Sequence, residues 1–132
     1  PPERPRHLLG IGEPEDLLSG IEKGVDLFDC VAPTRLARNG MLYTHSGKIN
    51  LFNSKYIHDF SKPDEKCMCG TCLKYSKAYL AHLFRAKEIL GATLVSFHNV
   101  YFLTNLVEQA REAVLENRFE NFKDTFLSSY QK

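Results

Sequence analysis

Three cysteines lie close together at Cys67, Cys69 and Cys72, and His98 follows further along the chain. A Cys-x-Cys-x-x-Cys segment can place three sulfurs around one ion from a single tight turn, where Gly70 relieves the backbone. One more ligand from elsewhere would complete the closed tetrahedral set of a structural zinc site. The sequence therefore predicts one structural Zn²⁺ ion.

Two other interpretations of these cysteines are a redox pair at Cys69 and Cys72, and three unrelated buried thiols. Redox Cys-x-x-Cys pairs usually open a helix after a strand of a βαβ unit. Here the pair follows the polar stretch 61–66 and has a third thiol beside it. Ligand number and spacing favour the metal.

The fourth ligand has several candidates, because His58, His82 and Cys30 are also available. His98 is favoured because it lies between an apolar run and the start of a predicted helix. A side chain in that position can point toward a neighbouring loop.

An acidic side chain, Asp29, stands in the otherwise apolar run 27–31. Burying a charge costs several kcal/mol unless the site uses it. Strand alternation puts Asp26 on the opposite face, where it is explained by a backbone group or a nearby cation. The residues alone are equally compatible with a structural and a catalytic Asp29.

The region around Asp29 has the pattern of a βαβ unit. The run 7–12 predicts a buried strand entering a tight turn, Pro14 opens a helix that Gly24 can end, and 25–31 predicts a second buried strand. The strands of such a unit are parallel, and ligands gather at their carboxyl ends. Gly10 and Asp29 fall at those ends.

The remainder of the chain predicts a hairpin and three helices. Segments 41–44 and 48–52 form the expected hairpin, and the cysteine segment then belongs to an insertion. Helical spacing predicts helices over 74–90, ending at Gly91, over about 99–116, and over 119–130. The aromatic stripe of the last helix is expected to pack in the core.

Composition limits the chain to one core, with 132 residues, 43% of them hydrophobic, and a net charge of +1. No apolar run reaches the roughly 18 residues of a membrane span, and the start of the chain has no signal-peptide core. Cysteines engaged by a metal fit a reducing compartment, so a cytoplasmic protein is expected.

Between Cys30 and His58 there is no acidic residue, whereas four basic residues fall inside this window: Arg35, Arg38, Lys48 and Lys55. A local positive excess can bind phosphates. On charge alone, an ordinary solvated hairpin surface is an equal interpretation.

Several short sequence motifs of this chain, in their order and spacing, resemble the carboxyl-terminal part of the tRNA-guanine transglycosylase family. The motifs are Gly-Val-Asp-Leu-Phe-Asp-Cys-Val at 24–31, Pro-Thr-Arg at 33–35, Arg-Asn-Gly at 38–40, the cysteine segment, and His-Asn at 98–99. The resemblance runs from residue 2 to residue 130.

The resemblance implies an α/β fold, in which this chain is the carboxyl-terminal fragment of a TIM (β/α)8 barrel with an inserted zinc-binding subdomain and closing helices. Residues 1–38 would form the last βαβ portion, with the nucleophile strand. Residues 39–132 would form the hairpin, the insertion and the helices as one structural unit. A whole barrel needs roughly 250 residues, so this fragment alone is expected to be inactive.

The resemblance also implies an activity, namely exchange of guanine at the tRNA wobble position for a 7-deazaguanine precursor of queuosine. Asp29 falls on the family's nucleophile, which bonds covalently to the ribose. Leu9, where methionine is common, and Gly10 fall on the base pocket, and Arg35 and Arg38 fall on tRNA-contacting positions.

In this family, the zinc held by the cysteines and His98 is structural, and the full enzyme is a homodimer. Two strings, 38–40 and 88–92, look closer to bacterial members, which favours a preQ1-type base over queuine. A competing interpretation is a zinc-stabilised RNA-binding or dimerisation module without chemistry of its own.

Overall fold

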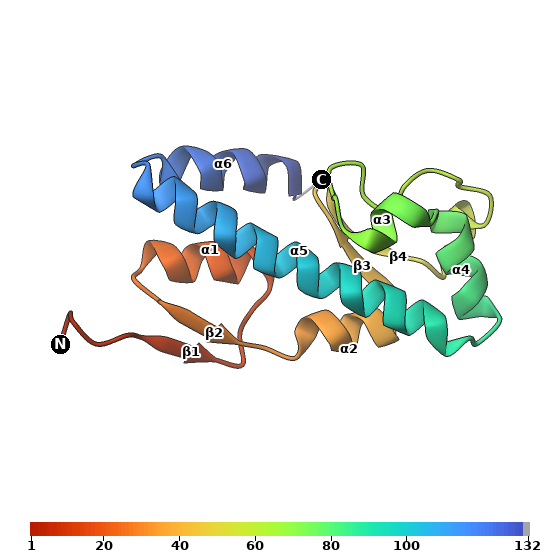
Figure 1. Cartoon of the computed structure of the whole chain (residues 1–132), viewed down its shortest axis with the longest axis horizontal. Coiled ribbons are helices and arrows are strands. Elements are labelled where there is room, and N and C mark those ends of the chain that lie inside the picture. Colours follow the sequence, from red (N-terminus) through yellow and green to blue (C-terminus); the bar gives the residue numbers. More distant parts are fainter. Residues whose placement is uncertain (131–132) are drawn as a thin grey trace.

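The computed structural model describes residues 1–130 and arranges them around one long helix, α5 (Ile89–Leu115) (Figure 1). Five other helices pack against it: α1 (Pro14–Glu22), α2 (Ala32–Arg38), α3 (Gly70–Lys74), α4 (Lys77–Arg85) and α6 (Phe119–Tyr130). The α/β class is confirmed, although helices dominate the described residues.

The expected βαβ unit is present. Strand β1 (His7–Leu9) pairs in parallel with β2 (Leu27–Asp29), in a register that places Leu9 opposite Asp29. The prediction that these strands are buried was wrong for this chain, since Leu9 is 64% and Leu27 52% exposed. Only the face of Phe28 packs on the helices, because none of the described residues covers the other face.

The predicted hairpin is confirmed as β3 (Met41–Thr44) and β4 (Gly47–Asn50), paired antiparallel. Strand β3 lies against α5, and Leu42 and Tyr43 are fully buried there. A 3-10 turn, η1 (Ser54–Tyr56), leads into the cysteine loop, which ends in the short helix α3 (Gly70–Lys74).

Three helix boundaries differ from the prediction. The helix expected from residue 74 begins at Lys77, because Lys74 ends α3 and Tyr75 and Ser76 are extended. Helix α4 ends at Arg85, because Lys87 adopts a left-handed φ of 58° and Glu88 N donates to Leu83 O at 2.9 Å. Helix α5 then begins at Ile89, ten residues before the expected start near Asn99. Gly91 ends no helix; it lies inside α5, where a Cβ would come 3.1 Å from Cβ of Leu83.

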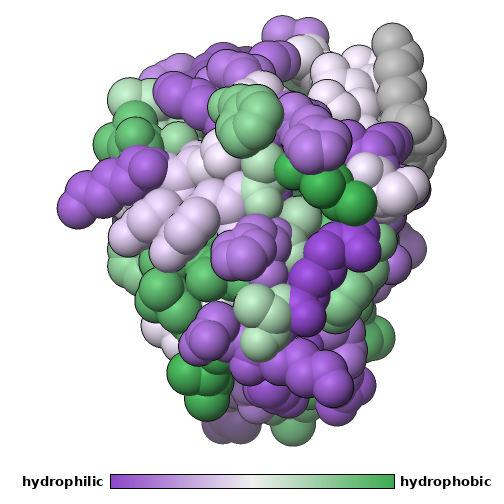
Figure 2. Space-filling model, turned by 90° about the vertical axis from the view of Figure 1, so that its right-hand side faces the viewer, coloured by the Kyte–Doolittle hydropathy of each residue, from purple (hydrophilic) through white to green (hydrophobic). Residues whose placement is uncertain are grey.

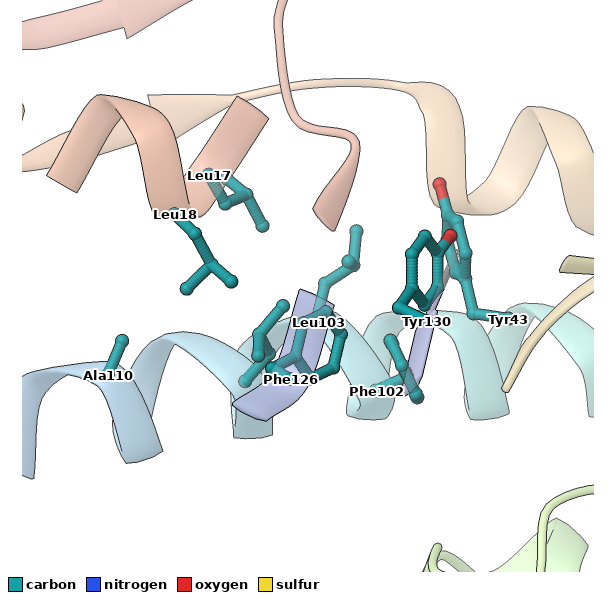
Figure 3. Close-up of a cluster of buried hydrophobic side chains, with 9 residues drawn as sticks. Leu17, Leu18, Tyr43, Phe102, Leu103, Ala110, Phe126 and Tyr130 are labelled. Carbon is teal, nitrogen blue, oxygen red and sulfur yellow. The ribbon is translucent and has the colours of Figure 1, made fainter. Parts of the chain in front are cut away.

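The main hydrophobic cluster joins α1, β3, α5 and α6 (Figure 3). Phe126 stacks on Tyr130 with ring centroids 5.3 Å apart and also faces Phe102 at 6.3 Å. The prediction that the last helix packs through its aromatic residues is thereby confirmed. A second cluster joins α2, the hairpin, α4 and the start of α5.

The surface is mixed in character. On the face shown in Figure 2, hydrophilic residues predominate and hydrophobic patches lie scattered among them. Within residues 1–130, no helix combines the length and the apolarity that crossing a bilayer requires.

Candidate metal centre and strand-tip carboxylate

The three predicted cysteines and His98 meet in one buried cluster. Their four ligand atoms all lie within 4.8 Å of one another. Nδ1 of His98 is 3.5, 3.3 and 3.2 Å from the sulfurs of Cys67, Cys69 and Cys72. A tetrahedral ion with bonds of about 2.3 Å to sulfur and about 2.0 Å to nitrogen separates these atoms by about 3.5 Å. The donor set and its dimensions therefore fit a metal ion of zinc's size.

His98 reaches this cluster from the middle of α5, where its side chain is fully buried. The expectation that it lies at a helix junction was wrong, although the residue itself is in the cluster. Its Nε2 donates to the backbone oxygen of Tyr43 at 2.7 Å, which leaves Nδ1 as the nitrogen that faces the sulfurs. The other candidates, His58, His82 and Cys30, are not part of the cluster.

The ionisable groups of the cluster perturb one another strongly. Hydrogen bonds from Cys67 and Cys72 lower the pKa of Cys69, whereas hydrogen bonds among the same thiols raise the pKa of Cys72. Burial opposes charge on His98, but hydrogen bonds with Cys67 and Cys69 prevail and raise its pKa to about 10. Thiols this crowded release all their protons only when a cation balances the thiolates.

Hydrogen bonds between side chains and the backbone order the cysteine loop and hold it against α5. Cys69 is the N-cap of α3, and its sulfur accepts a hydrogen bond from the backbone N–H of Cys72 at 3.5 Å. The hydroxyl of Thr71 donates to Leu94 O of α5 at 2.8 Å. The loop is therefore docked on the helix that carries the fourth ligand.

Asn99 was not identified from the sequence as a positioning residue. It is fully buried, accepts from Tyr43 N at 3.0 Å, and donates to the carbonyls of Pro33 and Met41, each at 3.0 Å. One side chain thus joins α5 to β3 and α2. Its only sequence signal was its place beside His98 in the His-Asn string at 98–99, because helical periodicity does not distinguish Asn99.

A second missed contact lies at the entrance to the cysteine loop. The carboxyl group of Asp64 is 2.6 Å from Nδ1 of His45. Burial by itself would raise the pKa of Asp64, but hydrogen bonds from His45 outweigh burial and hold the pKa below its ordinary value. No sequence pattern indicated this pair, because its partners come from different elements.

The tip of the parallel strands brings together three predicted site residues. Gly10 N donates to Asp29 O at 2.7 Å, and Leu9 lies opposite Asp29. Gly10 has a φ of +75°, and a Cβ there would meet nothing within 4 Å, so the backbone requires glycine and open space lies above it. Asp29 is exposed, whereas Asp26 accepts from Arg6 N at 2.7 Å, as expected of a structural carboxylate.

The two predicted RNA-contacting arginines lie one turn apart in α2, which follows β2 directly. Arg35 and Arg38 are both exposed and occupy the last turn of the helix, where cations suit the helix dipole. Of the other basic residues in the acid-free window, Lys48 contacts Glu13 at 3.4 Å and Lys55 lies over the Tyr56 ring. The two arginines therefore lie on the helix that directly follows the strand carrying Asp29.

A family model described as queuine tRNA-ribosyltransferase matches residues 1–132. The chain belongs to the queuine tRNA-ribosyltransferase family. Relatives of that name include one from Caldanaerobacter subterraneus, 53% identical over 98% of this chain, and one from Helicobacter acinonychis, 55% identical over 98%. A third, from Herpetosiphon aurantiacus, is 51% identical over 99% of the chain.

The chain spans about a third of the length of these relatives, between 33% and 35% in the three cases. Within the queuine tRNA-ribosyltransferase family it corresponds to the carboxyl-terminal third. The resemblance inferred from the sequence motifs is thereby confirmed.

Proposed function

We propose that this chain forms the nucleophile-bearing and tRNA-binding third of a tRNA-guanine transglycosylase. The enzyme would exchange guanine at the wobble position of a tRNA anticodon for a 7-deazaguanine base of the preQ1 type. The observation that supports this most directly is the strand tip, where an exposed Asp29 lies beside open space over Gly10.

In this proposal Asp29 is the nucleophile, and its carboxylate bonds to the ribose anomeric carbon as guanine leaves. A carboxylate that captures an oxocarbenium-like centre is the chemistry of retaining glycosidases. The target nucleotide must leave its stack to reach the site. Leu9 and Gly10 would then form part of the pocket that receives the base.

The remainder of the active site would come from a TIM barrel, of which β1 and β2 are two neighbouring strands. Two features support this proposal. The outward faces of Leu9 and Leu27 are apolar and exposed, and a hollow of about 350 Å³ next to β2 is lined by Leu27, Phe28 and Leu103, among others. Apolar surfaces of this kind suit further barrel strands and helices. Residues 1–38 would then be the barrel portion, and 39–132 the unit that covers it.

The metal we propose at the Cys67, Cys69, Cys72 and His98 cluster is one structural zinc ion. A closed Cys₃His set leaves no open position for substrate, so the ion would shape the fold and would not activate water. A reducing compartment keeps cysteine thiols free to bind a metal, so we also propose that the protein is cytoplasmic. We further propose that the complete enzyme is a homodimer.

The experiment that tests the nucleophile is trapping of a covalent protein–tRNA adduct with the full-length protein. The wild type should give an adduct that resists denaturation, and Asp29→Asn should give none. Asp26→Asn is the matched control, because Asp26 is a carboxylate of the same region on the opposite strand face; this variant should still form the adduct. An adduct that survives in Asp29→Asn would assign the nucleophile elsewhere. No adduct in any variant would favour the non-catalytic RNA-binding module.

The role of Arg35 and Arg38 is tested by the salt dependence of tRNA binding. If each contacts a phosphate, replacing either with Ala should weaken binding and reduce the slope of log K against log salt by about 1. Arg111→Ala is a control, because Arg111 lies in α5 and pairs with Glu108. Unchanged slopes for both variants in filter-binding measurements would refute the phosphate contacts.

A further inference from the structure

Asp64 is a buried carboxylate at the entrance to the metal loop, and its oxygens are well supplied with donors. It is 6% exposed and accepts from His45 N at 3.1 Å, from His45 Nδ1 at 2.6 Å, and from Lys66 N at 3.2 Å. Its own carbonyl accepts from Cys67 N at 3.2 Å. The conformation of Asp64 therefore helps to fix the position of Cys67, the first of the proposed metal ligands along the chain.

His45 is itself held in place by aromatic packing. Its ring lies edge-on to Phe102 of α5, with centroids 5.0 Å apart, and to Phe126 of α6, at 6.3 Å. Two helices thus limit the ring to one orientation, with Nδ1 directed at Asp64. A hydrogen bond between groups already fixed by packing costs little further side-chain entropy.

Residues at the end of β3 contact both parts of the ligand cluster, His98 and the cysteine loop. Tyr43, two residues before His45, accepts the Nε2 proton of His98 and so orients the fourth ligand. His45 then holds Asp64, which holds the loop of the three cysteines. Residues that orient metal ligands in this way affect metal affinity without touching the ion.

We propose that His45 is a positioning residue of the metal centre, which acts through Asp64 to keep the cysteine loop in its ligating conformation. Loss of the His45–Asp64 contact lets the loop open around Cys67 and speeds metal release. This inference rests on the zinc ion proposed above. It differs from an ordinary stabilising ion pair, which would lower overall stability without a selective effect on metal release.

The test measures the rate at which full-length, zinc-loaded protein releases zinc to an excess of a chelating dye. His45→Phe keeps an aromatic ring between Phe102 and Phe126 and removes the donor to Asp64; release should become about 10 to 100 times faster. His45→Asn places an amide N–H near the position of Nδ1 and should restore release to near the wild-type rate. Lys77→Met is the matched control, because it breaks the more exposed pair with Asp59 in the same part of the chain and should leave the rate unchanged.

The outcomes distinguish a failure of the proposed role of His45 from a failure of the proposed zinc site. A wild type without stoichiometric zinc overturns both. A wild type with zinc and a His45→Phe variant with the same release rate overturns only the role of His45. The double variant with Asp64→Asn should release zinc no faster than the faster single variant, and additive acceleration would contradict action through one contact. If His45→Phe does not fold, Asp64→Asn takes its place, with the same expected acceleration and the same refutation.

Discussion

A single backbone carbonyl, that of Tyr43, determines which nitrogen of His98 can face a metal. Because Nε2–H donates to Tyr43 O at 2.7 Å, Nδ1 is the nitrogen that remains for a metal ion. The same residue uses its backbone N–H to hold Asn99. At the residue scale, the metal centre therefore depends on side chains that the ion would never contact.

Tyr130 provides a prediction at this scale. Its hydroxyl is buried beside that of Tyr43 (Figure 3) and has no hydrogen-bond partner among residues 1–130. An unpaired buried hydroxyl is destabilising, so Tyr130→Phe should raise the free energy of unfolding by about 1 kcal/mol near pH 7. Tyr43→Phe is the control, because the Tyr43 hydroxyl contacts Glu13 at 3.4 Å and its loss should not stabilise.

The same substitution predicts a pH dependence. Burial raises the pKa of Tyr130 above its ordinary value of 10.0, so the folded chain holds this proton more tightly than the unfolded chain does. The resulting stability is fully present below pH 10 and declines as pH rises toward the folded pKa, by up to about 1.4 kcal/mol per unit. Chemical denaturation should show a shallower alkaline decline in Tyr130→Phe. Parallel curves for the two proteins would contradict this.

At the scale of the elements, helix ends define how the chain turns around α5. Helices α4 and α5 both end in Schellman motifs whose left-handed residue is not glycine: Lys87 with φ 58° and Asn117 with φ 56°. In each motif the amide beyond that residue donates back five positions, from Glu88 to Leu83 and from Arg118 to Ala113. These two turns allow α4 and α6 to fold back on the same long helix.

Lys87 offers a test of this geometry. A left-handed conformation costs a non-glycine residue about 1 kcal/mol, so Lys87→Gly should raise thermal stability slightly. Lys87→Val, with a branched Cβ, should lower it by more than about 1 kcal/mol. Lys74→Val is a comparison in a right-handed helical position. Equal effects of Val at 74 and 87 in thermal melts would argue against the αL cap.

At the scale of the whole molecule, the candidate metal centre is a separate packing unit. The three cysteines form their own buried cluster with Tyr101 beside it, whereas the main core joins α1, β3, α5 and α6 through large apolar side chains. The cysteine loop therefore lacks an apolar core of its own. Its order would come from ligation, which in structural zinc sites contributes about 10–16 kcal/mol to folding.

Metal removal should consequently unfold one part of the molecule before the other. Chelation of the full-length protein at neutral pH should increase amide exchange in residues 60–74 strongly and in α6 only weakly. Returning zinc should restore protection, which serves as the control for irreversible damage. Amide exchange is measured by mass spectrometry. An equal increase in residues 60–74 and in α6 would mean that the metal supports the whole fold.

The sequence alone determined the ligand types, the strand that carries Asp29, the hairpin and the last helix, because these depend on local spacing and turn chemistry. It failed between residues 86 and 98, where apolar spacing continues through a left-handed turn at Lys87 and a glycine that serves helix packing. The sequence favoured His98 as the fourth ligand, but only the tertiary structure excluded His58, His82 and Cys30 from the cluster and joined His45 to Asp64. The physical reason is that these contacts connect residues distant in sequence, and their geometry follows from how β3 and the cysteine loop pack against α5.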